Sequence, residues 1–284
     1  MQALWMLVST LMFAIMGASV KFASEQQVTL GEIILMRGLP SVFLLLVWAR
    51  QSGRSLRPTA WQPHFWRNLS GISAMWAGFY AVTLLPLATA TTLNYTAPLF
   101  IAGWMLGWGG ARRDGVRVLA VALGFAGVLA VMRPAINPDE WAAALLGLSA
   151  GALGAVAQLQ VRSLGRLGEP VWRVVLYFSA CSSLSGLLVM LWQGWHAPTL
   201  AGWAALVVLG LSGLFGQLAM TRAFGAGSAL LSAALQYTII IWASLLGFLV
   251  WGDRPDPSAA IGMALIIGAS LLSVWRTLRS PHTL

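Results

Sequence analysis

Ten apolar runs, each near the length that crosses a bilayer, follow one another along the chain. An α-helix needs about 20 consecutive apolar residues to span the hydrocarbon core. Short polar or basic gaps separate the runs, which occupy residues 3–23, 30–49, 67–85, 88–108, 116–132, 140–161, 171–192, 200–222, 227–251 and 258–276. This pattern predicts an all-α integral membrane protein with ten transmembrane helices.

The basic residues in the gaps predict which way the chain faces. Cytoplasmic loops of membrane proteins are enriched in arginine and lysine. With alternate gaps assigned to opposite sides, thirteen arginines fall on the side that holds both termini, and only Lys21, Arg133 and Arg254 fall on the other. We therefore expect an even number of crossings, with both termini in the cytoplasm.

Composition supports a membrane protein and argues against several other functions. Of the 284 residues, 58% are hydrophobic and 9% are charged, against about 25% charged in soluble domains. The net charge of +9 is spread over short gaps, which argues against a nucleic-acid partner. Cys181 is the single cysteine, and His64, His196 and His282 are far apart. We expect no catalytic residue, no metal and no cofactor, and no nucleotide-binding loop is present.

Acidic residues stand where helix starts need them. Thr29 with Glu32 and Asn137 with Glu140 have the spacing of capping boxes. Glu169 and Asp256 each precede a proline that can begin a helix. We interpret these carboxylates as helix caps.

The second half of the chain echoes the first at a spacing near 140 residues. Gly31-Glu32 corresponds to Gly168-Glu169, and Leu93-Asn94-Tyr95-Thr96 corresponds to Leu235-Gln236-Tyr237-Thr238. Because each half holds five crossings, an odd number, the second half enters the membrane from the opposite side. We expect two inverted five-helix repeats around a central cavity. The predicted units are residues 1–133 and 138–279, followed by a cytoplasmic tail at 280–284.

Two stretches of the sequence resemble a known family. The segment 85–100, LPLATATTLNYTAPLF, is similar to the signature of the drug/metabolite transporter superfamily, in the ten-helix branch with two EamA domains. Thr221-Arg222-Ala223, Gln236-Tyr237-Thr238 and Gly252-Asp253-Arg254-Pro255 resemble the second domain's signature. The resemblance implies a multi-pass protein of a bacterial inner membrane that moves small metabolites such as amino acids.

Deep polar and aromatic side chains are the candidates for a substrate site. Polar groups in hydrocarbon turn toward other helices or toward a wet cavity. An interhelical hydrogen bond is the alternative role for each of them. Aromatic faces suit an ammonium group, and amides and hydroxyls suit a carboxylate. The predicted substrate-binding residues are Trp76, Tyr80, Asn94, Tyr95, Gln158, Gln217, Gln236, Tyr237 and Trp242.

Arg37 is the one charge deep within a predicted span. It either pairs with Glu32 or reaches a carbonyl or a substrate carboxylate. No Asp or Glu lies deeper than Glu32, so we expect facilitated diffusion or weak coupling rather than a proton relay.

Three functions remain open from the sequence. The first is a secondary transporter that exports amino acids or similar metabolites by alternating access through the bilayer. The second is a multidrug exporter, and the third is a membrane-embedded enzyme that modifies lipids. The third lacks a nucleophile with a base and lacks paired carboxylates. The sequence leaves the oligomeric state open, and a monomer is compatible with it.

Overall fold

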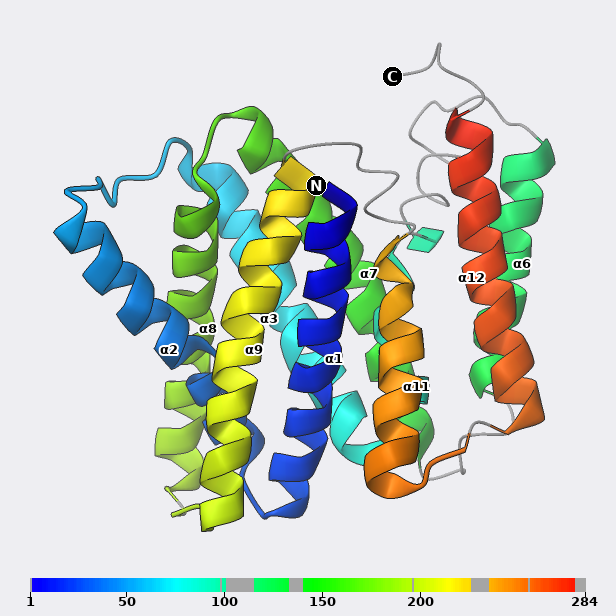
Figure 1. The fold of residues 1–284 in the computed structure, drawn as a ribbon, viewed down its shortest axis with the longest axis horizontal. Helices are drawn as coiled ribbons and strands as arrows, with labels where there is room; N and C mark the ends of the chain where they lie inside the picture. Colours follow the sequence, from blue (N-terminus) through cyan, green and yellow to red (C-terminus); the bar gives the residue numbers. More distant parts are fainter. Residues whose placement is uncertain are drawn as a thin grey trace.

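The computed structural model describes residues 2–97, 99–100, 115–132, 140–195, 197–225, 235–254 and 256–278, and the regular structure in these ranges is α-helical (Figure 1). The helices are α1 (Gln2–Glu25), α2 (Leu30–Gln51), α3 (Trp61–Leu84), α4 (Leu87–Asn94), α6 (Gly115–Met132), α7 (Trp141–Arg166), α8 (Val171–Gln193), α9 (Leu200–Gly225), α11 (Thr238–Trp251) and α12 (Pro257–Leu278). The first turn of α1 and the last turn of α12 lie at the same end of the bundle (Figure 1).

Most helix boundaries fall within a few residues of the apolar runs. Five helices of the described ranges are long and apolar enough to cross a membrane, and they are α1, α2, α7, α8 and α9. A crossing by all ten helices stays a prediction. α3 begins at Trp61, six residues before the run that predicted it. Its first two turns contain His64 and Arg67, which are polar but buried. Because the prediction used apolar runs alone, the part of these turns before Arg67 was not assigned to the helix.

The two runs that carry the repeated motif are not continuous helices. α4 ends at Asn94 and α11 begins at Thr238, whereas the sequence predicted helices over 88–108 and 227–251. Residues 101–108 and 227–234 of those predictions lie outside the described part of the chain.

The helices of the two halves alternate in the bundle. The most extensive packing joins α3 to α7, α1 to α9, α6 to α12 and α2 to α8. Each of these pairs takes one helix from before residue 133 and one from after residue 140. The pair α6 and α12 stands at one side of the molecule (Figure 1). The bundle is therefore a single assembly of two interlocked halves.

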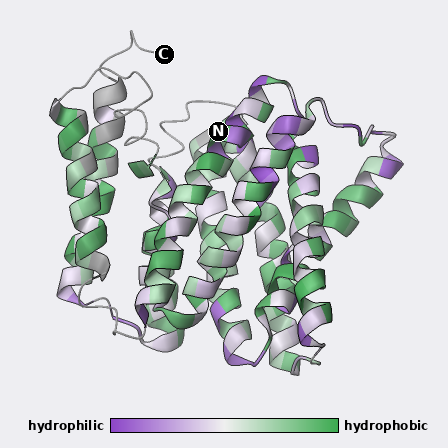
Figure 2. Ribbon diagram, turned by 180° about the vertical axis from the view of Figure 1, so that it is seen from behind, coloured by the Kyte–Doolittle hydropathy of each residue, from purple (hydrophilic) through white to green (hydrophobic). Residues whose placement is uncertain are grey.

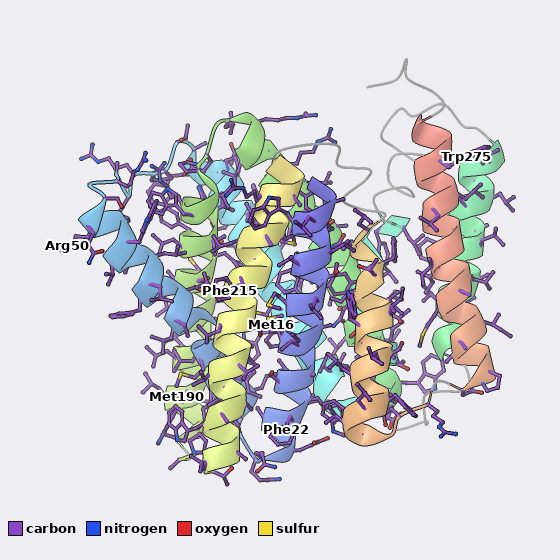
Figure 3. All side chains as sticks on the ribbon, viewed as in Figure 1. Met16, Phe22, Arg50, Met190, Phe215 and Trp275 are labelled. Atoms are coloured by element: carbon purple, nitrogen blue, oxygen red, sulfur yellow. The ribbon has the colours of Figure 1, made fainter. Side chains whose placement is uncertain are left out.

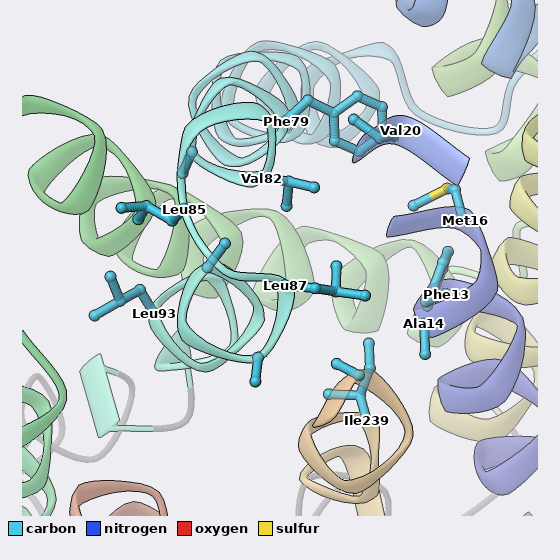
Figure 4. Packing of buried hydrophobic residues seen from close by; sticks show 14 of the residues in the cluster. Phe13, Ala14, Met16, Val20, Phe79, Val82, Leu85, Leu87, Leu93 and Ile239 are labelled. Carbon is cyan, nitrogen blue, oxygen red and sulfur yellow. The ribbon is translucent and has the colours of Figure 1, made fainter. Parts of the chain in front are cut away.

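An apolar cluster joins α1, α3, α4 and α11 at the centre of the bundle. Phe13, Phe79, Leu87 and Ile239 meet there from these four helices (Figure 4). The outer surface is also apolar, with side chains such as Phe43, which is 66% exposed. Hydrophilic residues lie mostly toward the ends of the bundle (Figure 2), and Arg50 marks the outer end of α2 (Figure 3). An apolar outer face is what contact with lipid requires.

The caps were predicted with mixed success. The Thr29 and Glu32 capping box is confirmed, because the Thr29 N–H donates to Glu32 Oε2 at 2.9 Å and the Glu32 N–H donates to Thr29 Oγ1 at 3.4 Å. Asn137 lies outside the described residues. Glu169 is not a cap of α8, whose first residue follows Pro170 without a side-chain cap.

Glycines allow α2 and α8 to approach closely. A Cβ atom added at Gly186 would lie 2.5 Å from Leu35 N and 2.7 Å from Gly31 O, both of which are backbone atoms that cannot turn aside. Small residues at such crossings let two backbones pack by van der Waals contact. The close crossing therefore depends on glycine at position 186.

Replacing Gly186 by alanine should destabilise the protein. The added methyl group forces α2 and α8 apart, and overpacking of this kind costs about 1–3 kcal/mol. The measurement is the thermal unfolding midpoint in detergent. Gly268→Ala is the matched control, because a Cβ there meets nothing within 4 Å; equal midpoints for the two variants would contradict the proposed close packing.

Candidate functional site

Two helices are interrupted at the repeated motif. The α4 helix stops at Asn94, with Tyr95 at its C-cap, and α11 starts after Tyr237. At each break a threonine hydroxyl donates to the carbonyl three residues earlier, Thr96 to Leu93 at 2.8 Å and Thr238 to Leu235 at 2.7 Å. The two halves thus use the same local hydrogen bond at corresponding positions.

A cavity of about 190 Å³ lies beside these breaks. Residues of α1, α2, α3, α4, α7, α8 and α9 line it, together with residues around the start of α11. Among the described residues, α6 and α12 contribute none. Most of the lining is apolar. The polar and charged members are Arg37, Arg67, Thr91, Asn94, Tyr95, Gln158, Gln217 and Gln236.

Five of the nine predicted site residues lie on this cavity. They are Asn94, Tyr95, Gln158, Gln217 and Gln236. Asn94 is held in place because its Nδ2 donates to the Gly78 carbonyl at 3.2 Å, and a Cβ at Gly78 would press on this amide. The side chains come from α4, α7, α9 and the segment before α11, so both halves of the chain contribute.

The other four predicted residues do not line the cavity. Trp76 donates from Nε1 to Ser185 Oγ at 3.1 Å and so ties α3 to α8. Tyr80 is 42% exposed, Tyr237 is buried, and Trp242 packs against the central apolar cluster. Trp76 and Tyr80 are absent from the lining because they lie on a different face of α3.

On α3 the lining residues recur at helical spacing. They are Arg67, Gly71, Ala74, Met75, Gly78, Phe79 and Val82. Residues three and four apart share a face of a helix. Trp76 and Tyr80 are four apart and fall outside this series, so they occupy a different face. Aromatic character alone did not distinguish these faces.

Sequence reasoning missed Arg67 and Phe178. Arg67 was counted with the cytoplasmic arginines because the predicted run began at this residue, six residues after the actual start of α3. The Arg67 guanidinium carbon lies 4.0 Å from the centroid of the Phe178 ring, and that of Arg37 lies 4.7 Å from the same centroid. Gly71 leaves the space that the Arg67 guanidinium fills. The signal was present in the spacing of Arg67, Gly71 and Gly78.

Arg37 does not turn to Glu32. Its Nη2 donates to Gln217 Oε1 at 3.3 Å, which joins α2 to α9. The Glu32 carboxylate binds the Thr29 N–H in the cap of α2. Of the two roles expected for Arg37, contact with a carbonyl group fits the structure and pairing with Glu32 does not.

The sequence matches the EamA-like transporter family over residues 1–133 and 140–275. The chain belongs to this family. It is therefore a membrane transporter of the drug/metabolite transporter superfamily and not an enzyme.

Named relatives of this transporter cover most of its length. It is 28% identical over 260 residues to the pseudopaline exporter CntI of Pseudomonas aeruginosa, which spans 91% of this chain and 90% of that one. It is 25% identical over 266 residues to the S-adenosylmethionine uptake transporter of Rickettsia prowazekii, with 88% and 86% covered. It is 31% identical over 232 residues to the riboflavin transporter of Rhizobium johnstonii, with 78% and 74% covered.

A solved structure supports the fold. One crystal structure, described only as that of a protein, matches with a TM-score of 0.72 and covers 98% of this chain and 97% of its own. The two sequences are 19% identical. At this level of identity the similarity supports the fold of the transporter and says nothing about its substrate.

Polar contacts tie the two halves of the transporter together at both ends. At one end Lys21 Nζ lies 3.0 Å from Asp253 Oδ2, and Trp251 Nε1 donates to Glu25 Oε1 at 2.6 Å. At the other end the Glu169 carboxylate accepts from the Thr59 N–H at 2.7 Å. The first set joins α1 to α11, and the second joins the loop before α3 to the loop before α8.

The Glu169 carboxylate has two further contacts, from Arg173 and from His64. With Thr59 these residues form the Glu169 cluster. Arg173 Nη1 donates to Glu169 Oε1 at 3.0 Å, and His64 Nε2 lies 3.5 Å from the same oxygen. Burial alone would raise the pKa of the Glu169 carboxyl, but hydrogen bonds from Thr59 and Arg173 outweigh burial and hold this pKa below its usual range. The ionised carboxylate therefore stabilises the folded transporter.

Glu169→Gln should lower the free energy of unfolding at pH 7 by about 1–3 kcal/mol, because Arg173 loses its charged partner. The measurement is the thermal unfolding midpoint, which should fall accordingly. A depressed pKa gives stability that is present above the unfolded value of 4.5 and is lost as the pH falls through the folded value. The gap between wild type and variant should therefore narrow between pH 5 and about pH 3. Glu25→Gln is the control, because no ion pair of Glu25 is found among the described residues and the glutamine oxygen can still accept from Trp251 Nε1. A gap that stays constant with pH would contradict the assignment.

Proposed function

We propose that the chain is a secondary transporter that exports amino acids and similar small metabolites across a bacterial inner membrane by alternating access. The observation that carries this proposal is the cavity between the two halves, to which both halves contribute amide side chains. A largely apolar pocket with a few placed polar groups is typical of small-molecule sites. Export is supported by the similarity to the pseudopaline exporter over nearly the whole chain.

The packing of the helices supports an inverted repeat. If α1–α6 and α7–α12 are related by a pseudo-twofold axis, α1 corresponds to α7 and α3 corresponds to α9. The contact of α1 with α9 then corresponds to that of α7 with α3, and both are among the most extensive. The contacts of α2 with α8 and of α6 with α12 correspond to themselves. Such a relation lets the halves exchange conformations around one midplane site.

The arginine distribution supports the orientation. Both termini would face the cytoplasm, because the gaps on that side hold most of the arginines. The Glu169 cluster would then close the cytoplasmic end, and the pair of Lys21 with Asp253 would close the outer end. The two sets of contacts are therefore candidate gates, one for each side of the membrane.

Counterflow into proteoliposomes tests the function. Liposomes that contain the purified transporter and are preloaded with an unlabelled amino acid should take up the same labelled amino acid faster than liposomes preloaded with buffer. The panel holds amino acids, nucleosides and cationic drugs. Exchange of the cationic drugs alone would favour a multidrug exporter, and an absence of exchange across the panel would contradict the proposal.

Gln158→Ala should lower the rate of counterflow by about 2- to 10-fold, the loss expected for one neutral hydrogen bond to the solute. Gln158 lines the cavity. Gln160→Ala is the matched control, because Gln160 lies on the same helix and is not among the lining residues. Equal rates in the two variants, at equal folded yield, would remove Gln158 from the site.

A further inference from the structure

Two guanidinium groups share one aromatic ring at the cavity. Arg37 comes from α2, Arg67 from α3 and Phe178 from α8, and all three side chains line the cavity. The guanidinium carbons lie 4.7 Å and 4.0 Å from the Phe178 ring centroid. Both arginines are only 4% exposed. Two positive charges are therefore held close together in the interior of the protein.

No carboxylate balances these charges in the part of the chain that the structure describes. The ion pairs found there between groups that are charged at neutral pH are Lys21 with Asp253 and Arg173 with Glu169, and the His64 imidazole lies beside the same Glu169. The described lining of the cavity contains no Asp and no Glu. Buried charges in proteins are normally paired. An arrangement that serves packing alone would be expected to include a counterion.

Several polar atoms on the lining lack a partner among the described residues. The donors are Arg37 Nε, Arg37 Nη1, Arg67 Nε and Gln217 Nε2. The acceptors are Asn94 Oδ1 and Gln236 Oε1. The orientation of the Asn94 amide follows from its contact, because Nδ2 donates to a carbonyl and leaves the oxygen open. The same reasoning applies to Gln217, whose oxygen accepts from Arg37. The open donors gather around the two arginines.

We propose that the cavity binds an amino acid or a related metabolite with at least two carboxylates and one amine. Arg37 and Arg67 bind the carboxylates, and the open oxygens of Asn94 and Gln236 accept from the ammonium group. Guanidinium groups suit carboxylates because they offer several donors in a planar fork. Such a solute is a net anion at neutral pH. This substrate class rests on the proposed transport function and narrows it.

An anionic substrate also provides a driving force for export. Over a complete cycle the protein returns to its starting state, so the net charge moved is that of the solute. An inside-negative potential of 100 mV favours the exit of a monoanion by about 50-fold. A buried acid that carries protons is not needed for such export. Cationic drugs, in contrast, are repelled by the two arginines.

Ligand-induced stabilisation of the purified transporter tests the binding site. L-glutamate and L-aspartate should raise the unfolding midpoint in a saturable manner. L-glutamine, L-asparagine and L-lysine should bind at least about 10-fold more weakly, since each lacks the second carboxylate. Inorganic phosphate should also bind at least about 10-fold more weakly, since it has neither two separate carboxylates nor an amine. Equal or stronger stabilisation by glutamine, lysine or phosphate would overturn the proposed class. This comparison uses the wild-type protein and does not depend on any variant.

The variant Arg67→Met tests whether Arg67 binds the ligand or only supports the fold. The variant should lose the response to glutamate, and its midpoint without ligand should be no lower than that of the wild type, because an unbalanced buried charge has been removed. A structural role predicts a lower midpoint instead. Arg67→Lys keeps the charge and loses the fork, so its affinity should be intermediate. Arg50→Gln removes one exposed positive charge from α2 and should respond as the wild type does. A full glutamate response in Arg67→Met would overturn the proposal.

Counterflow separates this inference from the proposed function. Labelled glutamate should exchange at least about 10-fold faster than glutamine, and a valinomycin-imposed potential, negative on the cytoplasmic face, should speed its exit. Exchange of neutral amino acids that Arg67→Met leaves unchanged would overturn the anion site while transport stands. Saturable binding of glutamate without exchange of any solute would contradict the transport function while the anion site stands.

Discussion

A polar group inside a bilayer needs a partner within the protein, and the rest of this structure depends on how that need is met. Threonine hydroxyls at positions 96 and 238 donate to carbonyls at two helix breaks. Unbroken helices would direct every backbone group along their own axes. Breaks that are satisfied locally allow Asn94, Tyr95 and Gln236 to lie beside the cavity. The motif that recurs in the two halves therefore has a structural reason as well as a place at the site.

The sequence was enough to locate most of the helices. It was not enough to predict which face of each helix points toward the cavity. Apolar runs located most of the helices because length and hydrophobicity alone reveal a segment suited to the bilayer. Asn94 and Gln236 were recognised because they recur at corresponding positions. Trp76 and Tyr80 were predicted for the site but do not line the cavity: Trp76 binds Ser185 on α8, and Tyr80 is exposed. Their aromatic character did not reveal which face of α3 they occupy, because an outer surface that contacts lipid is as apolar as the packed interior. The amphipathic contrast that reveals the inner face of a soluble helix is weak here.

Arg67 shows a second limit of sequence reasoning. It is the first residue of the predicted run 67–85, and arginines at the cytoplasmic ends of apolar runs are typical orientation signals. The structure instead buries it against Phe178. The distinction depends on where α3 begins, and buried polar residues in its first turns hide that point. A charge close to the end of an apolar run can therefore serve the site rather than the orientation of the chain.

The pair formed by α6 and α12 lies at one side of the bundle (Figure 1). The two helices pack closely on each other, because a Cβ added at Gly127 would come within 2.7 Å of the Gly262 carbonyl. α6 also contacts Leu99 and Phe100, whereas the described part of α12 packs extensively on no helix other than α6. Within the described part of the chain, α12 is therefore attached to the bundle mainly through α6. A substitution that loosens the surface of α6 would loosen the attachment of α12 as well.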